Sequence, residues 1–237
     1  MTSAEPFYAP DLATIHAKHY ETLAQSAAGE LLPLLPTAAR VLDLGCGAGP
    51  LSVLLAAQDH QISGIDLSAS LLSIARQRVP SGRFEQGDIR TANFGRVDAI
   101  AAIGEVVNYA TAVSEPGALE SLALRVRESL PAHGLFLFDC AGPERHAEGE
   151  FVWSENPDSF VAMQAMRQGD TITRKITTFI KRDGVWQKSN EIHRLRTHQP
   201  SDVARVLETA GFEIQPLPGF GAYRLPNGLH PFLATAV

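Results

Sequence analysis

Closely spaced glycines mark the stretch VLDLGCGAGP, which covers Val41–Pro50. Glycine tolerates positive φ and lets a ligand approach bare backbone, while Pro50 suits the first turn of a following helix. The apolar residues before the first glycine are typical of a buried strand. The stretch therefore predicts a ligand-binding loop between a strand and a helix. Because position 50 is proline, the loop lacks the G-x-G-x-x-G spacing of dinucleotide sites.

Two carboxylates follow at the ends of the next two predicted strands. Asp66 lies in ISGIDLS, 21 positions after Gly45, and Asp88 lies in EQGDIR. An acidic residue at the distance of Asp66 from the glycine loop accepts hydrogen bonds from ribose hydroxyls. A carboxylate at the position of Asp88, after the third predicted strand, can accept a hydrogen bond from an exocyclic amine such as that of adenine. Either aspartate alone is equally compatible with capping a turn, but together with the glycine loop they predict a nucleoside without a pyrophosphate.

Strand and helix patterns alternate through the first part of the chain. The predicted strands are Arg40–Leu44, Gln61–Asp66, Arg83–Gln86, Val97–Ile103 and Leu135–Asp139, and the predicted helices are Leu51–Gln58, Ala69–Arg78 (capped by Ser68) and Leu119–Leu130. Such alternation requires crossover connections and an open parallel sheet. After a helix at Ser201–Ala210, capped by Ser201, a hairpin of Phe212–Leu217 and Pro231–Val237 is expected to close the sheet. The predicted fold class is α/β, a Rossmann-like seven-stranded, mostly parallel sheet with helices on both faces.

The pattern changes near Phe151. Three long segments rich in Thr, Val and Ile follow, joined by turns that contain QGD and DG, namely Phe160–Arg167, Thr171–Ile180 and Val185–Leu195. They predict a three-stranded antiparallel meander inserted after the fifth strand. Because strand-end loops face the ligand crevice, this insert is expected to form a lid, with core thickening or a dimer interface as the alternatives. The predicted organisation is one domain over 1–237, with an N-terminal helical cap at 1–36 and a lid subdomain at 151–198.

Composition limits the function classes. The chain has 237 residues, a formal net charge of −6 and two cysteines. The negative charge argues against nucleic acid and anionic membranes as partners. Cys46 and Cys140 are far apart and lie next to apolar runs, so no disulfide is expected. With no signal-peptide pattern and no apolar run long enough for a membrane span, the expected location is cytoplasmic.

At this point the sequence resembles the class I S-adenosylmethionine (SAM)-dependent methyltransferases. The matching stretches are VLDLGCGAGP, GIDLS, QGDIR, VDAIAAIGEVVNY and GLFLFDCAGP, in the family's order and spacing. The resemblance implies SAM as the cofactor. It implies that the SAM site is lined by Tyr20, Asp43, Gly45, Cys46, Gly47, Gly49, Asp66, Leu67, Asp88, Ile89, Ile103 and Gly104. Within this set, Asp66 is implied to bind the ribose and Asp43 to orient the loop or the SAM ammonium.

Residues near the transferred methyl are the candidates for handling the acceptor. Glu105 and Tyr109 follow the fourth strand, and His193 lies on the third meander strand, so these three are the expected catalytic residues. Asn108 and His16 are the expected substrate contacts. The structural alternatives are a hydrogen bond from Glu105 to the loop backbone, packing of Tyr109, and an ordinary strand histidine at position 193.

Other protein classes fit the sequence less well. A DNA amino-methyltransferase would carry a PPY-type motif where this chain has IGEVVNY. A metal-dependent enzyme needs several converging carboxylates, and only Glu105 and Asp139 qualify, so no metal is expected. The sequence therefore predicts a SAM-dependent methyltransferase that acts on a nitrogen or oxygen of a small molecule, as a monomer or homodimer. The alternative is a methyltransferase-like SAM-binding protein without turnover.

Overall fold

A seven-stranded sheet forms the centre of the molecule in the computed structural model, which describes residues 20–112 and 116–237. Its strands are β1 (Arg40–Leu44), β2 (Gln61–Asp66), β3 (Arg83–Gln86), β4 (Ala99–Ala102), β5 (Leu135–Ala141), β10 (Phe212–Pro216) and β11 (Leu229–Ala236). The strand order is β10-β11-β5-β4-β1-β2-β3. Only β11 runs antiparallel to its neighbours, β5 and β10. The predicted mostly parallel sheet of seven strands is confirmed.

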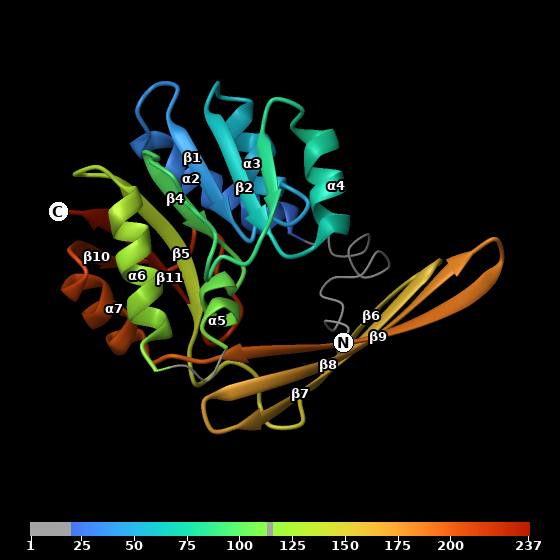
Figure 1. Ribbon diagram of the computed structural model, residues 1–237. Coiled ribbons are helices and arrows are strands. Elements are labelled where there is room, and N and C mark those ends of the chain that lie inside the picture. Colours follow the sequence, from blue (N-terminus) through green and yellow to red (C-terminus); the bar gives the residue numbers. More distant parts are fainter. Residues whose placement is uncertain (1–19, 113–115) are drawn as a thin grey trace.

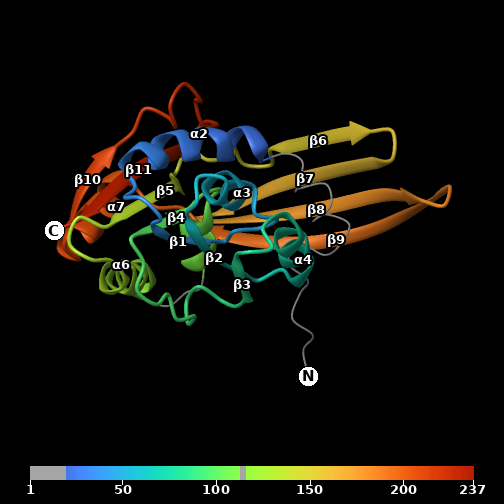
Figure 2. The ribbon, with the colours of Figure 1, turned by 90° about the horizontal axis from the view of Figure 1, so that it is seen from above.

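Helices cover both faces of this sheet (Figures 1 and 2). One layer holds α2 (Glu21–Leu31), α3 (Pro50–Ala56) and α4 (Ala69–Arg78), and the other holds α5 (Val106–Ala110), α6 (Ala118–Ser129) and α7 (Pro200–Thr209). A short 3-10 turn, η1 (Leu32–Leu34), follows α2. Each layer buries its apolar side chains against one face, so successive residues of β1 enter different cores: Val41 packs with the first layer and Leu42 with the second.

Two expected helix caps have different outcomes. The Ser68 side chain accepts a hydrogen bond from the backbone N–H of Leu71 at 3.2 Å, as predicted for the start of α4. The expected cap at Ser201 is wrong, because α7 begins one residue earlier at Pro200, with Gln199 at the cap position. Proline fits this first helical position because its missing N–H would have no partner there. The part of the predicted helical cap before residue 20 lies outside the described residues.

A second sheet follows β5 and extends away from the core (Figure 1). It has four strands in the order β6-β7-β8-β9, where the sequence predicted three. They are β6 (Phe151–Asn156), β7 (Ser159–Gln168), β8 (Thr171–Arg182) and β9 (Val185–Arg196). The additional strand, β6, pairs with β7 across a turn at Pro157 and Asp158, a sequence that favours chain reversal. Among the described residues, no helix is both long and apolar enough to cross a membrane.

Candidate cofactor and acceptor site

Most backbone N–H groups of the glycine loop after β1 donate hydrogen bonds to other groups of the protein. The N–H groups of Gly45 and Cys46 both donate to the carbonyl of Ile65, and the N–H of Gly47 donates to the Asp66 carboxylate at 2.9 Å. A phosphate-binding loop instead directs free N–H groups at its ligand. This loop therefore offers shape and a surface of bare backbone, which suits a nucleoside ligand that carries no phosphate.

The three glycines of the loop have different surroundings, although all adopt positive φ. A Cβ on Gly45 would lie 2.5 Å from a Val106 methyl group, and one on Gly49 would lie 3.3 Å from the Cβ of Ala75. A Cβ on Gly47 would meet nothing closer than a Leu71 methyl at 3.9 Å. Gly45 and Gly47 line the main pocket, whereas Gly49 is not among its lining residues. Gly49 therefore serves the turn and the packing of α4, and Gly47 forms the open floor of the pocket.

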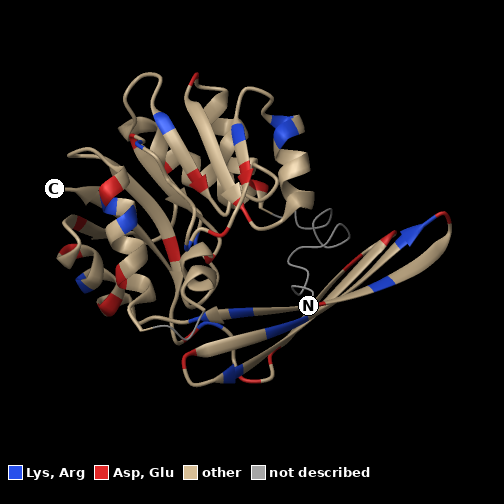
Figure 3. Ribbon diagram, viewed as in Figure 1, with Lys and Arg blue, Asp and Glu red and all other residues tan. Residues whose placement is uncertain are grey.

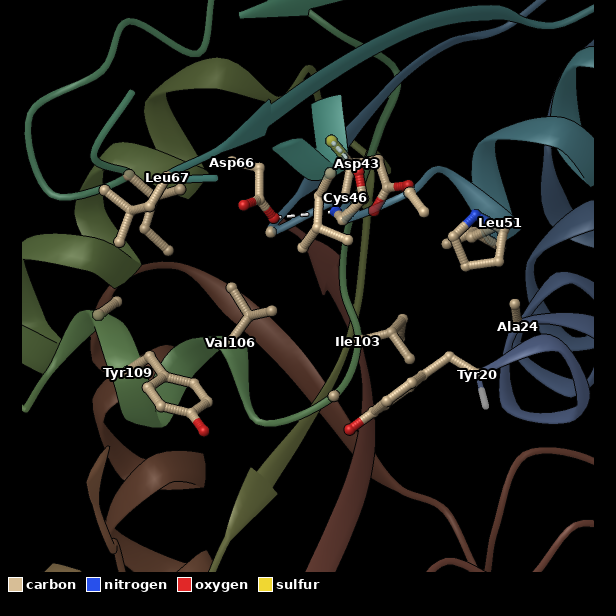
Figure 4. Close-up of a pocket in the computed structure, with 18 of the residues that line it drawn as sticks. Tyr20, Ala24, Asp43, Cys46, Leu51, Asp66, Leu67, Ile103, Val106 and Tyr109 are labelled. Carbon is tan, nitrogen blue, oxygen red and sulfur yellow. Dashed lines mark hydrogen bonds between the residues drawn. The ribbon is translucent and has the colours of Figure 1, made fainter. Parts of the chain in front are cut away.

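Two buried aspartates stand next to this floor (Figure 4). Asp66 accepts hydrogen bonds from the N–H groups of Gly47 and Ser68, which hold its carboxylate in one orientation. Asp43 accepts a hydrogen bond from the Ser52 hydroxyl at 2.7 Å. Burial raises the pKa of both carboxyls, that of Asp43 to about 7 despite the bond from Ser52. Each carboxylate oxygen has more than one lone pair, so both groups retain capacity to accept hydrogen bonds from a ligand.

The pocket continues past β2 and β3 along a wall that has both apolar and charged side chains. Leu67, Ile89 and Asp88 line it, together with Arg90. Leu67 is 46% exposed, which leaves its side chain available to a flat ring. The Asp88 carboxylate is bound by the Arg90 guanidinium and backbone N–H.

On the opposite side of the pocket lie two tyrosines (Figure 4). Tyr20 precedes α2 and packs next to Gly104, where an added Cβ would lie 3.3 Å from its ring. Tyr109 belongs to α5, and Ile103 and Val106 complete this side. Burial, and next the Glu105 charge, raise the pKa of the Tyr20 phenol, which therefore stays protonated at neutral pH. The pocket thus places carboxylates on one side and phenol hydroxyls on the other.

A buried ion-pair cluster lies behind the tyrosines. Glu105 is 4% exposed and sits at φ +65°, at the start of α5. Its carboxylate binds the Arg174 guanidinium of β8 at 2.7 Å and that of Arg145 at 2.7 Å. Arg174 also donates to the Tyr109 hydroxyl at 2.9 Å and lies 2.9 Å from Nε2 of His146. Arg174 thereby joins the second sheet to the pocket wall.

The electrostatics of Glu105 argue against the base role expected from the sequence. Burial alone would raise its pKa, but Arg174 and then Arg145 outweigh it and lower the pKa to about 2. A carboxylate with so low a proton affinity is a weak base, and both of its oxygens are engaged by arginines. Glu105 does not line the pocket either. Its position fits a structural role in holding Arg174 against Tyr109.

Asn108 and His193 are separated from the pocket. Asn108 is fully buried; its amide donates to the carbonyls of Ala141 and Arg196 and accepts from the N–H of Ala141. These bonds join α5 to β5 and β9, so the expected substrate contact does not fit this side chain. His193 is 1% exposed, and its Nε2 lies 2.9 Å from the Glu191 carboxylate. Its ring and that of Tyr109 form a T-shaped pair with centroids 6.0 Å apart, and His193 does not line the pocket. His16 lies outside the described residues.

Among the residues in or around the site that were not proposed from sequence are Asp139, Arg145 and His146. Asp139, at the end of β5, accepts hydrogen bonds from the N–H groups of Gly104 and Glu105, both at 2.6 Å. It thus fixes the loop that carries the left-handed Glu105. Arg145 and His146 follow on the β5–β6 connection. Their signal in the sequence is their place after a buried strand, where loops face the ligand crevice of an α/β sheet.

The comparisons with known proteins agree with this geometry. Residues 41–128 match the family of the methyltransferase domain. A protein from Geobacillus sp. (strain WCH70), whose name assigns it to the methyltransferases, is 28% identical over 188 residues, or 75% of each chain. The CcbJ methyltransferase of Streptomyces caelestis superposes with a TM-score of 0.81 at 18% identity, over 99% of this chain and 100% of that one. The sugar N-methyltransferase KedS8 of Streptoalloteichus sp. gives a TM-score of 0.78 at 20% identity, over 100% and 95%.

The strand order, the glycine loop after β1 and the acidic residue at the end of β2 define a Rossmann-like domain with a pocket at the carboxyl ends of its strands. Residues 41–128 match the methyltransferase domain family, and the fold and the relatives support a class I SAM-dependent methyltransferase with SAM as its cofactor.

Proposed function

We propose that this chain binds SAM in the pocket above the glycine loop and transfers its methyl group to a nitrogen or oxygen of a small molecule. The observation that supports this most strongly is one continuous pocket with an open floor at Gly47, buried carboxylates at Asp43 and Asp66, and hydroxyls at Tyr20 and Tyr109 on the opposite side. When bound, SAM supplies an activated methyl group on a positively charged sulfur.

The residues present fit this cofactor. We assign the ribose hydroxyls to Asp66, whose orientation is fixed by two backbone donors. Asp43 is suited to the cationic methionine part, and Leu67 and Ile89 are suited to the two faces or edges of the adenine. Gly45, Cys46, Gly47, Ile103 and Gly104 line the pocket and complete the set, whereas Gly49 acts through the turn.

The chain's contribution to methyl transfer is then mainly to orient the acceptor and exclude water. Holding two reactants in a reactive geometry can contribute about 7–11 kcal/mol in favourable cases. We propose that the hydroxyls of Tyr20 and Tyr109, both of which line the pocket, hold the acceptor atom by hydrogen bonds. Arg174 restrains the Tyr109 hydroxyl, and the second sheet carries Arg174, so we propose that residues 151–198 act as the lid.

The acceptor class follows from the relatives only in outline. A Streptomyces venezuelae protein, 22% identical over 85% of this chain, is named as an N,N-dimethyltransferase of a dTDP-linked amino sugar. A Variovorax paradoxus protein, 45% identical over 31% of this chain, is named as a trans-aconitate 2-methyltransferase. The names therefore include an amino sugar and an organic acid, and both acceptor types enter the proposal.

The direct test is release of S-adenosylhomocysteine from SAM when the purified protein is offered pools of amino sugars and of small organic acids. Isothermal titration with SAM is run in parallel. Binding and turnover with one pool support the enzyme. Binding with no turnover in any pool supports the alternative, a SAM-binding protein without activity, and absence of SAM binding contradicts both.

SAM affinity is expected to fall as the pH decreases through about 7. In the free site the Asp43 carboxyl has a pKa of about 7, so it is increasingly protonated below that pH. A cationic ligand binds better to the ionised carboxylate. At lower pH the Asp43 carboxyl must first lose its proton, so the affinity for SAM falls by up to about tenfold per pH unit. Titration calorimetry at about pH 6 and about pH 8 measures this difference. Asp43→Asn should bind more weakly at high pH and flatten the profile; an unchanged profile in that variant would assign the titration elsewhere.

Tyr109→Phe is expected to lower kcat about tenfold or more with the acceptor once it is known, because the hydroxyl that orients the acceptor is lost while the ring is kept. SAM affinity should be unchanged, because Tyr109 lies on the side away from the aspartates. Tyr223→Phe, which removes a hydroxyl outside the pocket lining, is the matched control. Equal activity of the two variants would exclude Tyr109 from the acceptor site.

A further inference from the structure

The second sheet has one buried face and one exposed face. On β8 and β9 the buried residues alternate with accessible ones, so that Ile172, Arg174, Ile176 and Thr178 lie on one face. This inner face carries Arg174 to Glu105 and Tyr109. The outer face bears large apolar side chains in the open, including Trp153 at 60% and Phe151 at 59% exposure. The exposed aromatic side chains on this sheet are not explained by the proposed catalytic role.

The outer face is built from cross-strand rows whose register the pairing defines. One row consists of Glu155, Phe160, Phe179 and Lys188, which are direct partners from β6 through to β9. Directly opposed residues of antiparallel strands project to the same face. The row therefore begins with an acid at one edge of the sheet, has two phenylalanines in the middle, and ends with a base at the other edge.

This row is complementary to itself. Consider a two-fold axis that runs parallel to the strands, between two stacked sheets. It reverses the strand order of the second sheet, while each row keeps its position along the strand direction. Glu155 of one sheet then faces Lys188 of the other, and Phe160 faces Phe179. The symmetry makes each of these contacts occur twice. A self-complementary patch of this kind is what an isologous contact requires.

The neighbouring rows follow the same rule. In the row of Phe151, Gln164, Lys175 and Ile192, the two-fold axis places Phe151 against Ile192 and Gln164 against Lys175. The next row places the exposed Trp153 over Asn190 at the partner edge. Within one chain the rings already form a continuous strip, with Trp153 stacked on Phe160 at 6.0 Å and Phe160 next to Phe179 at 6.3 Å. No row opposes like charges.

We propose that the outer face of the four-stranded sheet is the dimer interface of this protein, formed by face-to-face packing with the same face of a second copy. Stacked sheets pack at about 10 Å, with side chains of both faces interdigitated. Figure 1 shows the sheet projecting from the core, and Figure 3 shows both signs of charge on its distal part. Assembly and the lid role are compatible, because they use opposite faces of the sheet.

The test is a charge exchange monitored by sedimentation velocity and light scattering. Wild-type protein is expected to be dimeric at micromolar concentrations. Glu155→Lys and Lys188→Glu alone each place like charges opposite one another and should weaken the dimer about tenfold or more. Within one chain these residues occupy opposite edges of the sheet, so an effect of one on the other reports contact between copies.

Two combinations make the test specific. The double variant Glu155→Lys/Lys188→Glu should recover the dimer, and an equimolar mixture of the two single variants should form heterodimers, because each contact then pairs opposite charges. Glu213→Lys, an equal change at an exposed site on β10, should leave the assembly unchanged. Melting temperature and SAM binding confirm that each variant is folded. The proposal is overturned if the wild type is monomeric or if neither single change weakens the dimer. It is also overturned if both changes weaken the dimer but mixing does not restore it, which would place the contact at a strand edge instead.

Discussion

A Gly47→Val variant is expected to lose at least about 100-fold in SAM affinity, equivalent to about 2.7 kcal/mol. The site above Gly47 is open in the structure, with the Leu71 methyl 3.9 Å from an added Cβ, and it faces the pocket. A valine there would occupy the space that the bound nucleoside needs. Its φ of +53° adds strain for any residue with a Cβ. Calorimetry with SAM measures the loss.

The neighbouring glycine supplies the control. In Gly45→Ala the added Cβ would lie 2.5 Å from a Val106 methyl group. The main effect of this variant should therefore be on stability, seen as a lower melting temperature. Gly47→Ala should lie between the wild type and the valine variant in SAM affinity. If Gly47→Val is folded and binds SAM as well as wild type does, the glycine serves only the turn and the assignment of the pocket floor is wrong.

Glu105→Gln is expected to destabilise the fold by about 3–5 kcal/mol. The substitution removes the negative charge that binds both Arg174 and Arg145, and leaves two largely buried guanidinium groups next to a neutral amide. Breaking one side of a buried ion pair is costly because the remaining charge has lost its compensation. Urea denaturation measures the free energy of unfolding. Because α5 also forms part of the pocket wall, SAM binding should weaken with it.

The pH dependence gives a second measure of the same cluster. The pKa of Glu105 in the fold is about 2, below its ordinary value of 4.5, so the ionised group stabilises the fold above about pH 4.5. That contribution decreases as the pH falls from 4.5 toward 2, and it amounts to about 3 kcal/mol when complete. The stability difference between wild type and Glu105→Gln should therefore be constant near neutral pH and shrink in acid.

The partner substitution distinguishes a coupled cluster from independent effects. Arg174→Met should cost less than Glu105→Gln, because Glu105 keeps Arg145 at 2.7 Å. The double variant should be less destabilised than the sum of the two single changes, since both remove the same interaction. Strict additivity, or a Glu105→Gln variant as stable as wild type, would contradict the importance of this pair.

The sequence alone was sufficient for the seven-stranded sheet and for most of the residues that line the main pocket. The glycine loop, Asp66 and Asp88 each stand at the end of a parallel strand, and parallel strands all end at the same edge of a sheet. Residues that are distant in the chain are therefore brought together by topology, and the topology is readable from alternating strand and helix patterns. Local chemistry also explains the cap at Ser68, which depends on a hydrogen bond three residues away.

The acceptor side depended on the tertiary structure. Glu105 has the residue type of a base, but its partner Arg174 is 69 positions away on a strand that only the folded sheet brings beside α5. Asn108 likewise becomes a structural link through Arg196, 88 positions away. Whether a buried polar group is a ligand or a structural tie depends on its neighbours and its burial, and both are set by long-range packing. The sequence therefore determined where SAM is expected to bind, whereas the structure decided which polar residues line the pocket and which are held in structural contacts.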